Sequence, residues 1–340
     1  MKTSLRRIIP LASIIVASEL LRTQTIAAPE LFASVGTRLV GKVYANGISI
    51  AYESFGPTNR ETVLLIMGTG GQLTQWPPEL LAKLVERGYR VVCYDNRDVG
   101  LSTHLDAAGL PDWMAIGAAL KAGKRAPLTY TLDDMAKDAV GLLDALGINQ
   151  AHLVGASMGG MIAQIVATKF PERTRSLTSI MAGSGNPALP IPAKPDVIAK
   201  MPPPILNGST DAIIAREIKV WQVIGSPGYP TDEELLRTRV TEAVKRSYYP
   251  AGIERQGAAA AFAGDRRPSL KSIKAPTSVV HGSEDPIVPL EGGREVAASI
   301  PGAELRVIPG MGHDIPDALV PVVLEAITST ASRAAGREAR

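Results

Sequence analysis

The sequence has 340 residues, of which 45% are hydrophobic and 20% charged, the balance of an ordinary soluble globular protein. Its formal net charge is only +3, so electrostatics give no reason to expect a nucleic-acid partner. The single cysteine, Cys93, excludes an internal disulfide and lies in an apolar run that predicts a buried strand. After residue 34 no apolar stretch is long enough to span a bilayer, which predicts a soluble mature chain.

Residues 1–34 have the layout of a secretory signal. Three basic residues precede the apolar run 8–17, and small residues that suit a cleavage site follow at Ala27 and Ala28. Pro10 interrupts the apolar run, which leaves a disordered or mis-started leader as the alternative. We therefore expect a secreted or periplasmic protein if the signal is used, and a cytoplasmic one if it is not.

The first half of the remaining chain predicts a hairpin followed by alternating strands and helices. Asn46-Gly47 is a strong signal for a hairpin turn between the strands 42–44 and 48–55. Short apolar runs predict buried strands, and helical periodicity predicts the helices that separate them. We expect strands at 62–67, 89–94, 152–156 and 176–181, and helices at 79–87, 131–146 and 158–169.

The second half interrupts this alternation and then resumes it. Residues 183–265 begin with a proline-rich stretch and continue as helices at 211–223 and 232–247, with no strand signal. Strands at 277–281 and 304–308 and helices at 290–300 and 316–331 then follow, before a tail from Ser332 that we expect to fray. The sequence predicts one α/β core (residues 35–182 and 266–334) with a helical cap or lid, residues 183–265, inserted between two strands.

The pentapeptide Gly155-Ala156-Ser157-Met158-Gly159 is G-x-S-x-G, and it stands between a predicted strand and a predicted helix. In that context the motif marks a sharp, strained turn that exposes a nucleophilic serine. Glycines flank the serine because a side chain at either position would collide across so tight a turn. Ser157 is therefore the candidate nucleophile, although a glycine-rich turn with an exposed serine is the structural alternative.

A serine hydroxyl is a poor nucleophile at neutral pH and needs a base, for which the chain offers four histidines. His313 lies in a glycine-containing loop just after the last predicted strand, and it is the candidate base. His152 and His281 lie at the ends of predicted strands and are expected to be structural, with His281 placed to support the loop that follows it. His104 is expected in a surface or supporting role.

The third member must accept the other N–H of the histidine and hold its tautomer. Asp285 follows a predicted strand directly and precedes His313 by 28 residues. Glu284 beside it is the rival, and we favour Asp285. The order nucleophile, acid, histidine is that of the α/β-hydrolase arrangement.

An oxyanion hole needs two preorganised N–H donors. One is expected from the backbone of Met158, which follows the nucleophile, and the other from Thr69, in the glycine-rich loop 68–71 after a buried strand. A flexible turn is the simpler interpretation of that loop, and no lysine stands where a phosphate-binding loop would need one.

With these residues in place, the chain resembles the α/β-hydrolase fold superfamily from about Gly41 to its final helix. Residues 95–102 (DNRDVGLS) match the D-x-R-x-x-G-x-S stretch of many members, and 282–289 (GSEDPIVP) resemble their acid loop with Asp285 at the acid position. The resemblance implies a mostly parallel eight-stranded sheet with helices on both faces and a helical lid. It also implies structural roles for Arg97 and Asp98.

The oxyanion loop departs from the His-Gly pair of many members, since this chain has Met67-Gly68-Thr69-Gly70-Gly71. With residues 94–102, this makes the chain similar to esterases of the aclacinomycin methylesterase type. The resemblance implies a methyl or other small alkyl ester as substrate.

These features predict a serine hydrolase that cleaves a small-molecule carboxylic ester through an acyl-enzyme, with no metal and no organic cofactor. A cofactor-free haloperoxidase, which forms a peracid on the same triad, is the enzymatic alternative. A small-molecule receptor that keeps the fold without turnover is the alternative from another class. The sequence leaves the oligomeric state open.

Overall fold

A computed structural model describes residues 24–25, 37–189, 194 and 196–338 of the chain. The predicted leader, residues 1–34, lies outside the described residues except for Gln24 and Thr25, so its role as an export signal stays a prediction. In the described part of the chain, no helix is both long enough and apolar enough to cross a membrane.

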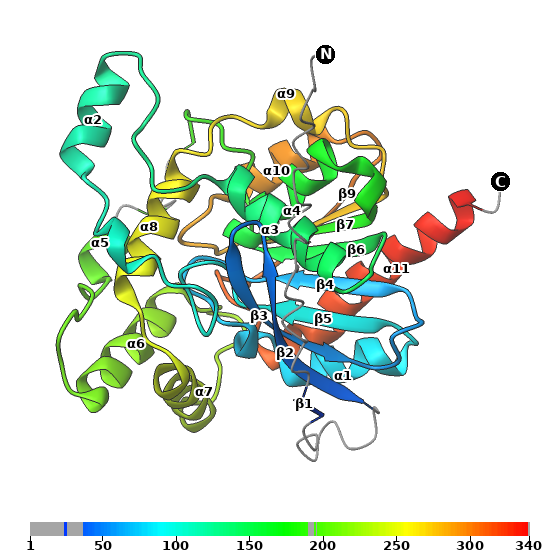
Figure 1. Cartoon of the computed structure of the whole chain (residues 1–340), viewed down its shortest axis with the longest axis horizontal. Helices are drawn as coiled ribbons and strands as arrows, with labels where there is room; N and C mark the ends of the chain where they lie inside the picture. The colour runs from blue at the N-terminus through cyan, green and yellow to red at the C-terminus, as the bar shows by residue number, and fades with distance from the viewer. Residues whose placement is uncertain (1–23, 26–36, 190–193, 195, 339–340) are drawn as a thin grey trace, which may run out of the picture.

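The described strands form one sheet in the order β1-β2-β3-β5-β4-β6-β7-β8-β9 (Figure 1). Neighbouring strands from β5 to β9 are parallel, whereas β3 runs antiparallel to both β2 and β5. The predicted mostly parallel sheet of eight strands is confirmed as β2–β9, and β1 adds two residues beside β2. The strands are β1 Gln24–Thr25, β2 Arg38–Ala45, β3 Ile48–Phe55, β4 Thr62–Ile66, β5 Arg90–Tyr94, β6 Ala151–Ala156, β7 Thr174–Ile180, β8 Thr277–Gly282 and β9 Glu304–Ile308.

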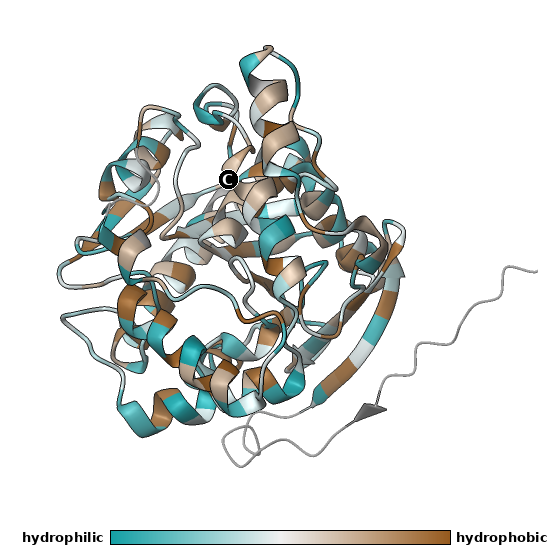
Figure 2. Ribbon diagram, turned by 90° about the vertical axis from the view of Figure 1, so that its left-hand side faces the viewer, coloured by the Kyte–Doolittle hydropathy of each residue, from teal (hydrophilic) through white to brown (hydrophobic). Residues whose placement is uncertain are grey.

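The strands at the centre of the sheet are buried on both faces, whereas the outer strand β2 alternates between buried and exposed residues. Every residue of β4, β5 and β6 is buried, because helices cover both faces of the sheet at its centre. Cys93 in β5 is buried as predicted, and burial raises the pKa of its thiol. Among the described residues, strand β2 has only the two of β1 on its outer side and is banded in hydrophobic and hydrophilic colours beside the grey trace in Figure 2; it buries Val43 and exposes Tyr44.

Helices cover the two faces of the sheet in separate layers. One core cluster joins α3, α4 and α10 to one face, and a second joins α1 and α11 to the other (Figure 1). Thr131 caps α3 together with Asp134 in the predicted capping box. These helices are α1 Pro78–Glu86, α3 Leu132–Ala145, α4 Met158–Lys169, α10 Leu290–Ser299 and α11 Val320–Glu338.

The tail does not fray where the sequence predicts it, because α11 continues to Glu338. Ala331 and Ala334 are buried, and Arg333 donates to the carbonyl oxygen of Thr277 at 2.8 Å, so the end of the helix packs against the sheet. For residues 332–338 the prediction of a frayed tail was therefore wrong, and residues 339–340 lie outside the described part of the chain.

The segment between β7 and β8 contains the predicted helices and others besides. We call residues 183–265 the cap segment; its helices α5–α8 lie together beyond one edge of the sheet (Figure 1). That this segment acts as a lid stays a prediction. The remaining helices are α2 Trp113–Lys121, α5 Asp196–Lys200, α6 Thr210–Ile224, α7 Glu233–Arg246, α8 Pro250–Ala261 and α9 Arg267–Leu270, of which α2, α5, α8 and α9 were not predicted.

Buried ion pairs tie the loop after β5 to helices on either side of it. Arg97 binds Asp138 of α3 at 2.6 Å, and Asp98 binds Arg255 of α8 at 2.8 Å, with both side chains of the second pair at most 1% exposed. Burial raises the pKa of Asp98, but hydrogen bonds from Arg255 and from the N–H of Leu105, together with the positive charge of Arg255, outweigh it and hold that pKa below its ordinary value of 3.8. Both residues bind protein groups, as structural roles require.

We expect Arg255→Met to lower the free energy of unfolding by about 3–5 kcal/mol, because it leaves the Asp98 carboxylate buried and unpaired. Arg267→Met is the control, since Arg267 pairs with Asp265 at the surface, where such pairs contribute about 0–1 kcal/mol. Denaturant unfolding at neutral pH measures both. The difference in the free energy of unfolding between wild type and Arg255→Met should narrow as the pH falls and Asp98 becomes protonated. Equal losses of stability in the two variants would contradict the prediction.

Candidate active site

Ser157 occupies the sharp turn between β6 and α4. Its backbone has φ of 55° and ψ of −123°, a conformation that costs about 1–3 kcal/mol for a residue other than glycine. The turn is held by its neighbours, since the Ser157 N–H donates to the carbonyl oxygen of Ile180 at 2.9 Å. A Cβ atom on Gly155 would lie 2.1 Å from the carbonyl oxygen of Gly159, and this explains why a glycine must flank the serine.

His313 reaches Ser157 from the loop after β9. Its Nε2 lies 2.9 Å from the Ser157 Oγ, and its Nδ1 lies 2.8 Å from an oxygen of Asp285. A carboxylate can only accept a hydrogen bond, so it selects the tautomer with the proton on Nδ1 and leaves Nε2 free to accept from the serine hydroxyl. The structure thus brings together the three residues that the sequence singled out.

Asp285 is oriented by the backbone that follows it. One carboxylate oxygen accepts from the N–H groups of Ile287 and Val288, both at 2.9 Å, which leaves the other oxygen for His313. Glu284 points elsewhere and pairs with Lys194 at 3.1 Å on a half-exposed surface. The structure therefore places Asp285, and not Glu284, next to the histidine.

The other three histidines contact groups outside the triad. His281 is fully buried under the acid loop, where its Nε2 lies 3.0 Å from the carbonyl oxygen of Val288, and burial lowers its pKa. A neutral ring in this place supports the loop, as expected. His152 lies 2.8 Å from the hydroxyl of Ser176, and His104 stacks on Tyr249 with ring centroids 4.0 Å apart.

The loop that carries His313 is fastened to the end of α6. The His313 N–H donates to the carbonyl oxygen of Ile224 at 2.8 Å. The Ser226 hydroxyl accepts from the N–H of Gly312 at 2.9 Å and donates to the Asp314 carboxylate in a very short contact. Burial raises the pKa of Asp314. Sequence reasoning missed Ser226, because nothing near it in the chain indicates that it meets the histidine loop.

The predicted oxyanion donors lie on the two loops that meet at Ser157. Gly68 packs so closely that a Cβ atom there would lie 3.0 Å from the Cβ of Ser157. Thr69 follows it and places its hydroxyl 3.6 Å from the sulfur of Met158. Among the hydrogen bonds of the described residues, none uses the backbone N–H of Thr69 or Met158, so both groups are free to donate to a ligand.

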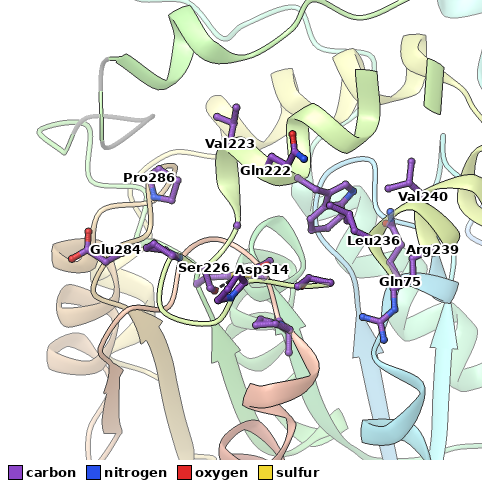
Figure 3. A pocket seen from close by; sticks show the side chains of 18 of the residues that line it. Gln75, Gln222, Val223, Ser226, Leu236, Arg239, Val240, Glu284, Pro286 and Asp314 are labelled. Carbon is purple, nitrogen blue, oxygen red and sulfur yellow. Dashed lines mark hydrogen bonds between the residues drawn. The ribbon is translucent and has the colours of Figure 1, made fainter. Parts of the chain in front are cut away.

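A cavity of about 570 Å³ lies between the cap segment and the ends of the strands (Figure 3). Its wall includes Pro286 and Asp314, which follow the acid and the histidine, and Met67 and Met181, which follow the strands on either side of β6. Ser157 is half-buried and is not itself one of the residues that line this cavity. On the cap side the wall is formed by α6, α7 and the loop between them, including Gln222, Ser226, Leu236, Arg239 and Val240 (Figure 3).

The wall mixes apolar and charged groups, and the charges are largely paired. Arg239 binds Asp317 through both carboxylate oxygens at 2.8 Å, and Lys200 binds Asp196 at 2.7 Å. Within the described ranges, no cluster of histidine, cysteine and carboxylate side chains has the arrangement of a metal site.

The chain belongs to the α/β hydrolase fold family. Residues 61–211 match the model of that family. RutD of Variovorax paradoxus is provisionally named a carbamate hydrolase. It is 31% identical to this chain over 277 residues, which are 77% of this chain and 88% of that protein. The rhodomycin D methylesterase DauP of Streptomyces sp. (strain C5) is 27% identical over 309 residues, 82% of this chain and 93% of the esterase. These relatives confirm the predicted resemblance.

Solved structures agree on the fold. A meta-cleavage product hydrolase from Pseudomonas fluorescens has a TM-score of 0.66 at 20% identity, with 86% of this chain and 97% of that chain covered. The enol-lactonase from Burkholderia xenovorans has a TM-score of 0.63 at 20% identity, with 86% and 99% covered.

We expect Gly159→Ala to destabilise the elbow, because the new Cβ atom would lie 2.0 Å from the carbonyl oxygen of Ile66. Overpacking of this kind costs about 1–3 kcal/mol or more. Gly117→Ala in α2 is the matched control: it also replaces a helical glycine, but its Cβ meets nothing within 4 Å. That variant should be neutral or gain up to about 1 kcal/mol. Denaturant unfolding measures both, and two variants of equal stability would refute the steric argument.

Proposed function

We propose that the protein is a serine hydrolase of carboxylic esters that works through an acyl-enzyme, with Ser157 as nucleophile, His313 as base and Asp285 orienting the histidine. The observation that carries the proposal is the continuous hydrogen-bonded chain from Ser157 through His313 to Asp285. The methylesterase and hydrolase relatives independently support ester hydrolysis. This is the arrangement that turns a weakly nucleophilic hydroxyl into an attacking group.

The reaction follows from the positions of these atoms. The Ser157 oxygen attacks the ester carbonyl carbon while its proton passes to Nε2 of His313. The negative charge that develops on the carbonyl oxygen is stabilised by the free N–H groups of Thr69 and Met158. His313 then gives its proton to the departing alcohol. Water, deprotonated by His313, attacks the acyl-enzyme and releases the carboxylic acid and the free serine.

Each role in this sequence is filled by a group of the chain, so the proposed chemistry calls for neither a metal nor an organic cofactor. Asp285 keeps its negative charge throughout and stabilises the imidazolium that forms twice in the cycle. The two N–H bonds from Ile287 and Val288 hold that carboxylate in place during both proton transfers.

We propose a methyl or other small alkyl ester of a larger organic acid as the substrate. Two relatives that are 27% and 26% identical are named rhodomycin D methylesterases, which suggests a small leaving alcohol. The cavity of about 570 Å³ lies within the size range of small-molecule sites and leaves room for a sizeable acid. Its mixed wall, with Leu236 and Val240 beside Gln222, suits an acid that carries both apolar and polar groups.

We expect Ser157→Ala to lower kcat for ester hydrolysis by about 10⁴–10⁶-fold and to abolish covalent labelling by a fluorophosphonate probe, because the attacking oxygen is gone. Asp285→Asn should lower kcat by about 10⁴-fold through the wrong histidine tautomer. The measurement is turnover of a panel of p-nitrophenyl and methyl esters, with labelling followed in parallel.

Ser209→Ala is the control, since Ser209 caps the exposed start of α6 and should leave turnover unchanged. Folded wild-type protein that neither labels nor turns over any ester would overturn the proposal. Tight binding of a small molecule without turnover would then favour a receptor on this fold. Halide oxidation in acetate and peroxide that exceeds ester turnover would favour the peracid-forming reaction instead.

A further inference from the structure

The loop that carries the proposed oxyanion donor Thr69 is fixed by a side chain outside the triad. Gly70, the next residue, has φ of +71°, and its N–H donates to the Oε1 of Gln256 at 2.8 Å. The Nε2 of the same side chain donates to the carbonyl oxygen of Arg97 at 2.6 Å. Gln256 is completely buried, which limits the access of water to its amide.

Both bonds require a single orientation of the amide. The Gly70 N–H needs an acceptor and the Arg97 carbonyl needs a donor, so the oxygen of Gln256 must face the loop and its nitrogen must face Arg97. A side chain held at both ends cannot rotate to follow a moving loop. Gln256 therefore acts as a fixed reference for the peptide that joins Thr69 to Gly70.

The helix that presents Gln256 is itself immobilised. Arg255, the preceding residue in α8, donates to both carboxylate oxygens of the buried Asp98, at 2.8 and 2.9 Å. Gly252, one turn earlier, lies so close that a Cβ atom would be 1.9 Å from the carbonyl oxygen of Asp98. The loop after β5, whose Arg97 carbonyl accepts from the Gln256 amide, therefore also fixes the position of the helix that carries Gln256.

We propose that Gln256 is a positioning residue for the oxyanion loop. The inference rests on the proposed ester hydrolysis, in which Thr69 donates its N–H. Because a peptide is planar, the bond to Gly70 fixes the peptide that joins Thr69 to Gly70 and so restricts the movement of the loop that carries Thr69. With the loop held in this way, the backbone N–H of Thr69 stays in place for the developing oxyanion before the substrate arrives. Preorganisation of this kind stabilises the transition state more than the bound substrate, so its loss lowers kcat and leaves KM nearly unchanged.

The test compares Gln256→Met, which removes both bonds and keeps the bulk, with wild type on the best ester of the panel. We expect kcat to fall about 10- to 100-fold with KM within about twofold, since removal of a whole oxyanion donor costs about 10²–10³-fold. The affinity for a boronic acid, which mimics the tetrahedral intermediate on Ser157, should fall in parallel with kcat. The affinity for the product acid should not.

Gln164→Met is the matched control. Gln164 is equally buried in α4, and its amide binds Ser179 and Arg266 at 3.1 Å, away from the oxyanion loop. This variant loses a buried amide network of the same kind, so we expect a comparable loss of stability and an unchanged kcat. Equal losses of kcat in both variants would show a general effect of stability and would overturn the inference.

Gln256→Glu keeps the inference testable if the methionine variant does not fold. Burial raises the pKa of the new carboxyl, and its protonated form can accept from Gly70 and donate to Arg97 as glutamine does. In the ionised form a carboxylate oxygen, which can only accept, would face the carbonyl oxygen of Arg97, so that hydrogen bond would be lost. The ratio of kcat in this variant to kcat in wild type should therefore rise as the pH falls.

The outcomes separate the two hypotheses. Wild-type protein without ester turnover or probe labelling overturns the proposed function itself. An active wild type, an inactive Ser157→Ala and a folded Gln256→Met with wild-type kcat together overturn the role of Gln256 alone. A ratio for Gln256→Glu that does not change with pH also counts against it.

Discussion

The structure depends on the close approach of the backbone at the elbow between β6 and α4. Ser157 can hold its strained φ of 55° only because Gly155 and Gly159 let α4 turn back against the ends of β6 and β4. The strain is balanced by the central sheet, where β4 and β6 are entirely buried. Everything else in the site is placed relative to this one oxygen atom.

The remaining groups reach Ser157 from the carboxyl ends of neighbouring strands. The acid follows β8, the histidine follows β9 and the oxyanion loop follows β4, so parallel strands deliver all of them to one edge of the sheet. Two side chains of the cap segment form hydrogen bonds to these loops. Ser226 accepts from the histidine loop, and Gln256 accepts from the oxyanion loop. The site is therefore a product of the core and the cap segment together.

The core and the triad could be predicted because they leave local signals in the chain. Apolar runs gave the central strands, and G-x-S-x-G, the acid loop and the loop of His313 each stand directly after a strand. Helix α8 escaped prediction because its run of small residues, broken by Gly252 and Gly257, shows no helical periodicity in hydrophobicity. Gln256 and Ser226 escaped because their partners lie 186 and 86 residues away in the chain.

The buried charges beneath the cap segment limit how this protein can be remodelled. Asp95 and Asp98 are both fully buried, and their guanidinium partners, Arg246 and Arg255, come from α7 and α8. A chimera that exchanged the whole segment for that of another hydrolase would strand two carboxylates in an apolar interior unless the incoming helices brought arginines to the same places. The boundary between a transplantable cap and the indispensable core therefore lies before α7 in the chain, well inside the segment that looks like a single insertion.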